Sequence, residues 1–218
     1  MTRMQRIKRT IAALSLAATA LTALPAQAEI RSLVVAGGCF WCVESDFDHM
    51  DGVVATISGY AGGEKKDPTY RDHGRHREVV KVDYDDTKTD YRTLVTQFLR
   101  TIDVTDDGGQ FCDRGRSYTT AIHAGNDAEA KTAREAIAEA QASLGQEIVT
   151  PVEGPATFWK AEDYHQGYYM SDVKVLTRFG LVSRARAYKG YREGCGRDAR
   201  VRALWGDQAF MGVHKAGS

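Results

Sequence analysis

The chain has 218 residues, a length that suits one ordinary domain. Its 29 Lys and Arg side chains are balanced by 29 Asp and Glu, so nothing indicates a polyanionic partner such as nucleic acid. With 43% hydrophobic and 27% charged residues the composition is that of a globular protein, which excludes disorder, a collagen-like chain and a coiled coil. Four cysteines are too few to staple a small disulfide-rich fold, which makes them candidates for chemistry.

The first 28 residues have the three parts of a secretory signal peptide. Basic residues lie at positions 3–9, an apolar run covers 11–24, and Ala26 and Ala28 are the small residues that a cleavage site requires. The run is too short to anchor the chain in a hydrocarbon core about 30 Å thick. We therefore predict cleavage after Ala28, a catalytic domain over 29–218, and a monomer located in the periplasm or secreted.

Strand-like and helix-like segments alternate along the rest of the chain. The predicted strands are 32–36, 53–58, 78–84, 119–123 and 152–158. The predicted helices are 39–49, 90–100 and 126–144, and another begins at 164–170. Asn126 and Gly145 have the residue types expected at the two ends of the clearest helix. From about residue 180 the pattern predicts an irregular segment, and the whole predicts a single α/β or α+β domain.

The sharpest local feature is Gly37-Gly38-Cys39, where a predicted strand turns into a predicted helix. Backbone N–H groups and the positive end of the helix dipole stabilise a thiolate at such a position, which predicts a lowered pKa for Cys39. A thiolate there would be a nucleophile. The alternative is a small buried residue, which is how most free cysteines behave.

Cys39 and Cys42 also form a C-x-x-C motif. In an exported protein this motif favours a thiol–disulfide oxidoreductase, although Trp41 lies between the two cysteines instead of before the first. A haem attachment site would need His where Val43 stands, and a structural zinc site would need a second pair of ligands. We therefore expect no metal.

Gly38-Cys39-Phe40-Trp41, followed by Glu44, resembles the signature of the class A peptide methionine sulfoxide reductases. Further pieces follow in the family's order over roughly residues 33–170, at 59–63, 68–70, 76–80, 113–118 and 161–166. The resemblance implies a two-layer sandwich of a mixed sheet with helices. It also implies reduction of methionine S-sulfoxide, free or in proteins, as a repair of oxidised exported proteins.

The resemblance also implies a role for each matching residue. They are the nucleophile Cys39, the proton donor Glu78, the oxygen-binding Tyr70 and Tyr118 with their acidic neighbour Asp113, and the methyl-binding Phe40 and Trp41. These types suit the chemistry, because a sulfoxide becomes a good electrophile only when its oxygen is protonated or strongly hydrogen-bonded. Attack by the thiolate leaves a sulfenic acid, and a dithiol reductant such as thioredoxin resets the enzyme without another cofactor.

One departure from the family concerns the proton donor. The loop between Tyr70 and His76 is shorter than the family's, and Arg75 and Arg77 flank His76. A cation close to Glu78 would oppose a raised pKa for this carboxyl group.

The other departures concern the thiol that resolves the sulfenic acid. Cys42 stands where the family often has Gly, and Cys112 stands where Asn is common. Cys112 is expected to be a buried wall of the pocket. Gly194-Cys195-Gly196 resembles the glycine-containing C-terminal segment through which family members often recycle, so the resemblance implies Cys195 as the resolving thiol. The two glycines would let this segment swing onto Cys39, and Cys42 is the alternative.

Overall fold

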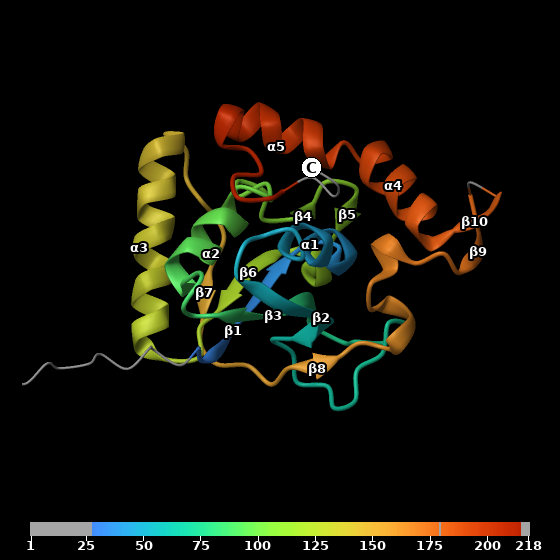
Figure 1. The fold of residues 1–218 in the computed structure, drawn as a ribbon, viewed down its shortest axis with the longest axis horizontal. Helices are drawn as coiled ribbons and strands as arrows, with labels where there is room; N and C mark the ends of the chain where they lie inside the picture. The colour runs from blue at the N-terminus through green and yellow to red at the C-terminus, as the bar shows by residue number, and fades with distance from the viewer. Residues whose placement is uncertain (1–27, 179, 215–218) are drawn as a thin grey trace, which may run out of the picture.

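A mixed six-stranded sheet forms the centre of the molecule (Figure 1). The computed structural model describes residues 28–178 and 180–214, so the predicted signal peptide, apart from Ala28, lies outside the described residues. The strand order is β7-β6-β1-β3-β2-β8, and every neighbouring pair is antiparallel except β6 and β7. The strands are β1 (Ile30–Gly37), β2 (Val53–Ala61), β3 (Arg77–Asp85), β6 (Thr120–His123), β7 (Val152–Glu153) and β8 (Trp159–Lys160). The predicted α+β class with a mixed sheet is confirmed.

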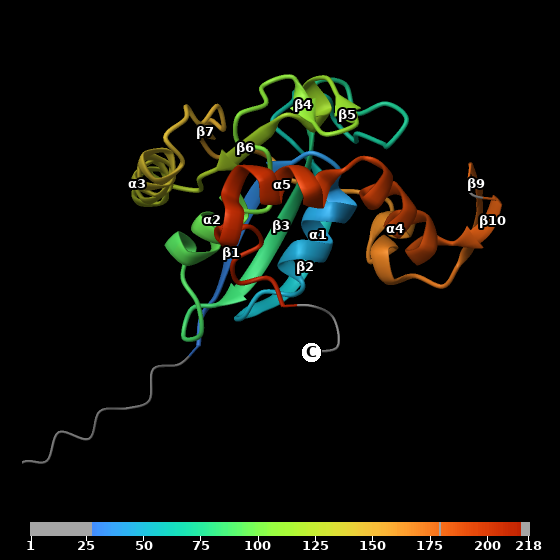
Figure 2. The same ribbon diagram turned by 90° about the horizontal axis from the view of Figure 1, so that it is seen from above.

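Three helices pack around the sheet within the ranges that the sequence predicts. They are α1 (Phe40–Phe47), α2 (Tyr91–Leu99) and α3 (Asp127–Leu144). Helix α1 contacts β1, β2 and β3, whereas α2 and α3 pack against each other (Figure 2). The side chain of Asn126 accepts a hydrogen bond from the Glu129 N–H, and Gly145 ends α3 in the left-handed conformation, as the sequence predicts.

The turn between β1 and α1 requires glycine. Gly38 has φ of +82°, a conformation that costs little only without a Cβ atom. A Cβ atom at this position would also lie 2.6 Å from Cβ of Gln110, a fully buried side chain. This turn fixes Cys39 at the N-terminus of α1.

The predicted strand over 152–158 is wrong. Two-residue strands replace it at opposite edges of the sheet, with β7 parallel to β6 and β8 antiparallel to β2. Pro155 has no N–H to donate to a neighbouring strand, so the segment crosses from one edge to the other. The predicted helix at 164–170 is instead two 3₁₀ turns, Asp163–His165 and Tyr168–Met170, separated by Gly167 in the left-handed conformation.

The prediction of an irregular C-terminal segment is also wrong. It contains the hairpin β9 (Lys174–Thr177) and β10 (Gly180–Ser183), followed by α4 (Arg184–Gly194) and α5 (Arg197–Trp205). Helix α5 buries Arg197, which donates hydrogen bonds to the carbonyls of Gly37 and Thr101, so a polar residue occupies a core position. Such a helix lacks the apolar stripe that sequence patterns detect.

The remaining strands, β4 (Gly109–Gln110) and β5 (Asp113–Arg114), form a short hairpin beside the 3₁₀ turn Arg116–Tyr118. Another 3₁₀ turn, Gly206–Gln208, follows α5. Over residues 28–178 and 180–214, no helix is both long enough and apolar enough to span a bilayer.

Candidate active site

A small cavity of about 80 Å³ lies at the N-terminus of α1. It brings together residues from segments that are far apart in the sequence. Its lining consists of Cys39, Phe40, Trp41, Tyr70, Glu78, Asp113, Tyr118 and Tyr191. All seven pocket residues implied by the family resemblance therefore meet in one place. Tyr191, in α4, is an addition that no motif indicated.

Glu78 is a buried acid that holds its proton at neutral pH. Its side chain is 2% exposed, and its Oε2 accepts a hydrogen bond of 3.0 Å from the Phe40 N–H. Burial raises the pKa of Glu78 to about 8; the Phe40 N–H lowers it in part, and the charge of Asp113 raises it further. A carboxyl group with this pKa can donate a proton near pH 7.

The arginine next to Glu78 does not oppose this shift. Arg77 precedes Glu78 in β3, so the two side chains lie on opposite faces of the sheet. The guanidinium of Arg77 contacts a carboxylate oxygen of Glu153 at 2.9 Å and donates to Thr119 Oγ1 at 2.8 Å. Arg75 is exposed. The expected opposition to a raised Glu78 pKa is therefore not found.

Two phenol groups face the same cavity from separate segments. Burial is the largest cause that raises the pKa of Tyr70 and of Tyr118, and the charge of Glu78 adds to it. Both groups therefore remain O–H donors at neutral pH. The Tyr70 N–H donates to Glu162 at 3.0 Å, which ties its loop to the segment after β8.

The predicted lowering of the Cys39 pKa is wrong. Cys39 is the N-cap residue of α1 and is only 6% exposed, so burial raises the pKa of its thiol well above the ordinary value. A hydrogen bond between the two thiols raises the pKa of Cys39 further and lowers that of Cys42. The positive charges of Arg197 and Arg192 also lower the pKa of Cys42. Of the two thiols, Cys42 is therefore the one whose thiolate form the surroundings favour.

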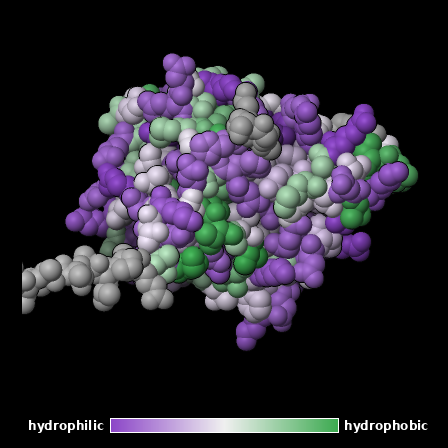
Figure 3. All heavy atoms as spheres, in the orientation of Figure 1, coloured by the Kyte–Doolittle hydropathy of each residue, from purple (hydrophilic) through white to green (hydrophobic). Residues whose placement is uncertain are grey.

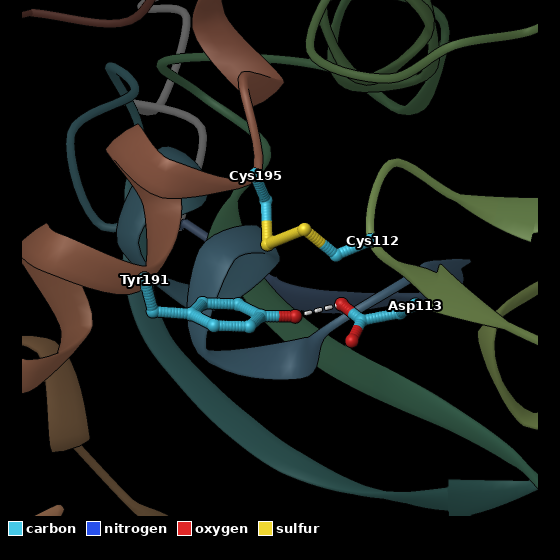
Figure 4. Close-up of a disulfide and its surroundings, with 4 residues drawn as sticks. All are labelled: Cys112, Asp113, Tyr191 and Cys195. Carbon is cyan, nitrogen blue, oxygen red and sulfur yellow. Dashed lines mark hydrogen bonds between the residues drawn. A yellow bond between two sulfur atoms is a disulfide. The ribbon is translucent and has the colours of Figure 1, made fainter. Parts of the chain in front are cut away.

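The other two cysteines form a disulfide at the edge of the pocket (Figure 4). Cys112 and Cys195 are separated by 83 positions in the sequence, and their Cα atoms lie 5.2 Å apart. Cys112 is exposed in the turn between β4 and β5, so the expectation of a buried pocket wall is wrong. Cys195 is not on a loose segment either, because Gly194 ends α4 and Gly196, with φ of +67°, precedes α5.

Helix α4 closes the cavity beside this disulfide. The hydroxyl of Tyr191 donates a short hydrogen bond to Asp113 Oδ2 (Figure 4). Cys112 precedes Asp113 in the chain, and Cys195 follows Tyr191 by about one helical turn. The hydrogen bond and the disulfide therefore hold the same two segments together. The spacing of Tyr191 and Cys195 is the only sequence signal that could have indicated Tyr191.

An aromatic wall forms the opposite side of the cavity. Phe40 is buried, and Trp41 stacks on Tyr168 with ring centroids 3.8 Å apart. The Trp41 Nε1–H donates to Nδ1 of His165 at 3.1 Å, which fixes the indole ring. In the described part of the chain, no group of three or more His, Cys, Asp or Glu side chains is arranged to hold a metal ion.

Comparisons with known proteins point to one family. The family model described as "Peptide methionine sulfoxide reductase" matches residues 31–192. A peptide methionine sulfoxide reductase MsrA 2 of Rhizobium meliloti is 52% identical over 198 residues, which cover 89% of this chain and 94% of the relative. An MsrA 2 of Caulobacter vibrioides is 41% identical over 81% of this chain and 86% of its own length. The solved structure of methionine sulfoxide reductase A of Corynebacterium diphtheriae matches with a TM-score of 0.59 and 32% identity, covering 64% of this chain and 73% of that one.

Proposed function

Because the chain belongs to the peptide methionine sulfoxide reductase family and its relatives are of the MsrA class, we propose how its residues carry out the family's reaction. It is an oxidoreductase that reduces methionine sulfoxide by cysteine and disulfide chemistry. The observation that carries the residue assignment is the buried Glu78, whose pKa of about 8 leaves it protonated in the same cavity as Cys39.

The first step transfers the substrate oxygen to Cys39. The sulfoxide oxygen lies among the Glu78 carboxyl and the hydroxyls of Tyr70 and Tyr118, and the methyl group lies against Phe40 and Trp41. Protonation by Glu78 makes the substrate sulfur electrophilic, and the Cys39 sulfur attacks it. The bond between the substrate sulfur and oxygen breaks, methionine leaves, and Cys39 becomes a sulfenic acid.

Cys42 takes the proton that Cys39 must lose in this attack. Its sulfur shares a hydrogen bond with Cys39, and two arginine charges favour its thiolate form. The atoms of this step balance, because one thiol and one sulfoxide give one sulfenic acid and one thioether. Return of this proton from Cys42 to Glu78 restores both groups for the next turnover.

The next steps transfer the oxidation from Cys39 to the Cys112–Cys195 pair. The Cys195 thiol condenses with the Cys39 sulfenic acid, which forms a disulfide and releases water. The Cys112 thiolate attacks the Cys195 sulfur, which frees Cys39 and forms the Cys112–Cys195 bond. Support comes from the place of this bond beside Tyr191 and Asp113, and from the exposure of Cys112. Direct resolution by Cys42, which contacts Cys39, is the competing first step.

Cys112, an exposed residue, is the proposed point of entry for electrons. Thiol–disulfide exchange requires access to a sulfur atom, and Cys39 and Cys42 are buried. The donor is a dithiol of the thioredoxin type, and the substrate is the S epimer in oxidised exported proteins. The proposed site of action is the periplasm or the extracellular space, reached by the N-terminal signal peptide.

Single-turnover reduction of each epimer of a methionine sulfoxide dipeptide tests these assignments. The pre-reduced mature protein should reduce the S epimer alone, Cys39→Ser should yield no methionine, and Glu78→Gln should be slow. If the wild type yields no methionine but reduces insulin disulfides, the C-x-x-C oxidoreductase reading replaces this one. Mass spectrometry of Cys112→Ser after one turnover identifies the resolving thiol: a Cys39–Cys195 bond supports the scheme, and a Cys39–Cys42 bond refutes it.

A further inference from the structure

A second hollow lies next to the catalytic cavity, between α4, the hairpin β9–β10 and the 3₁₀ turn Tyr168–Met170. Its volume is about 220 Å³, and we call it the apolar groove. It is lined by Trp41, Tyr168, Thr177, Arg178, Ala187, Tyr188 and Tyr191. Most of this lining is aromatic ring or methyl group.

The apolar groove adjoins the catalytic cavity. Trp41 and Tyr191 line both hollows, so these two side chains form a shared wall. A methionine sulfoxide side chain held in the cavity therefore has the neighbouring part of its peptide at the opening of the groove.

The walls of the apolar groove are packed against the rest of the chain. Tyr168 and Tyr188 are each 8% exposed and Ala187 is 6% exposed, so these groups are fixed by packing. The Tyr188 hydroxyl accepts a hydrogen bond of 2.9 Å from Arg192. An apolar side chain that enters would need to immobilise little of the protein, which favours binding.

We propose that the apolar groove is a binding subsite for a large apolar side chain, aromatic or leucine-like, that flanks the methionine sulfoxide in a peptide or unfolded segment. The proposal rests on the reductase function and adds a sequence preference to it. The size is adequate, because an apolar protein cavity of roughly 150 Å³ holds benzene. The chemistry is adequate too, because burial of an apolar side chain against aromatic walls releases its hydration water.

A different apolar surface lies on the outer face of the same hairpin. Leu176 and Leu181 pair across the two strands and are 83% and 66% exposed. Figure 3 shows a hydrophobic patch at its right, where Figure 1 places this hairpin. Side chains alternate between the two faces of a strand, so these leucines point away from the face that carries Thr177. They provide a control for general attraction of apolar peptides to the hairpin.

The test compares kcat/KM for free methionine S-sulfoxide with that for peptides in which the residue before or after it is Phe, Leu, Gly or Lys. In the wild type, a Phe or Leu neighbour on one side should raise kcat/KM about tenfold over Gly, mainly through KM. Ala187→Phe fills the groove from α4 and should reduce that preference to within about twofold. Ala199→Phe, the same change at an exposed position of α5, should leave the preference intact.

Several outcomes would overturn the proposal. Equal kcat/KM for all peptides refutes the subsite but not the reductase, whereas a wild type that reduces neither free nor peptide sulfoxide refutes the reductase. A preference that survives in folded Ala187→Phe, or that Leu176→Ser abolishes, places the binding elsewhere. If Ala187→Phe fails to fold, Thr177→Phe fills the groove from the hairpin instead. Ultracentrifugation that shows a dimer broken by either variant, with the preference unchanged, assigns the groove to a second copy of the chain.

Discussion

Replacement of Glu78 by Gln should make the protein more stable while it removes the proton donor. The folded protein holds Glu78 with a pKa of about 8, compared with an ordinary value of 4.5. Between these two pH values the folded state keeps a proton that the unfolded state releases. The native stability associated with this group is therefore present below pH 4.5 and is lost as the pH rises to 8.

The magnitude follows from the interval between the two pKa values. pH 7 lies about 2.5 units above the ordinary pKa of Glu78, and each unit lowers the free energy of the unfolded state by about 1.4 kcal/mol relative to the folded state. The wild type therefore loses roughly 3 kcal/mol of stability by pH 7. Gln has the same shape, stays neutral at every pH, and offers a carbonyl oxygen to the Phe40 N–H. Glu78→Gln should therefore exceed the wild type in free energy of unfolding by about 3 kcal/mol more at pH 7 than at pH 4.

Urea unfolding of both proteins between pH 4 and pH 9, with the disulfide kept intact, measures this difference. The gain should grow up to about pH 8 and then stay level, because both states of the wild type are ionised above that pH. Glu147→Gln, at an exposed position after α3, is the matched control for the change of side chain. A gain that does not vary between pH 4 and pH 8 would refute the reasoning that Glu78 is neutral in the folded protein.

Three further predictions concern the pocket and its turn. The single-turnover rate of the wild type should fall about tenfold per pH unit above pH 8, because Glu78 loses its proton there. A rapid-quench measurement in which the rate does not change with pH would contradict the role of Glu78 as the acid. Tyr191→Phe removes the hydrogen-bond partner of a half-buried Asp113 oxygen and should lower kcat/KM about fivefold or more. Steady-state kinetics on a sulfoxide peptide measures this loss, and an unchanged value would show that the hydrogen bond does not position Asp113. Gly38→Ala should cost about 1–3 kcal/mol of unfolding free energy, because Gly38 has a φ of +82° and the Gln110 side chain leaves no room for a Cβ atom. Gly154→Ala, with open space around it, is the control and should cost less in the same urea titration.

The sequence predicts those parts of the fold that depend on local spacing. The apolar positions of α2 recur with the helical period, and all of them are buried in the structure. Helix α5 was missed because Arg197 occupies its buried face, and the stabilising partners of this arginine are carbonyl groups far away in the sequence. A pattern that counts apolar residues cannot detect such a core position.

The candidate site could also be predicted only in part from the sequence. Cys39 and Glu78 could be identified because each belongs to a short motif, whereas the shift in the Cys39 pKa depends on burial and on Cys42, Glu78 and Asp113 around it. The Cys112–Cys195 bond joins residues 83 positions apart, and no spacing rule pairs them. Local motifs thus indicated the reacting groups, and only the folded chain shows how their protons and bonds are distributed.

The Cys112–Cys195 bond also connects the catalytic cycle to the lifetime of the protein. A cross-link over 83 positions restricts the unfolded chain and stabilises the folded one by about 4.5 kcal/mol in the loop-entropy model. In the proposed cycle this stabilisation appears when a sulfoxide has been reduced and disappears when the reductant arrives. The disulfide form, before the reductant acts, is then more resistant to proteolysis than the reduced form, which is the form that accepts substrate.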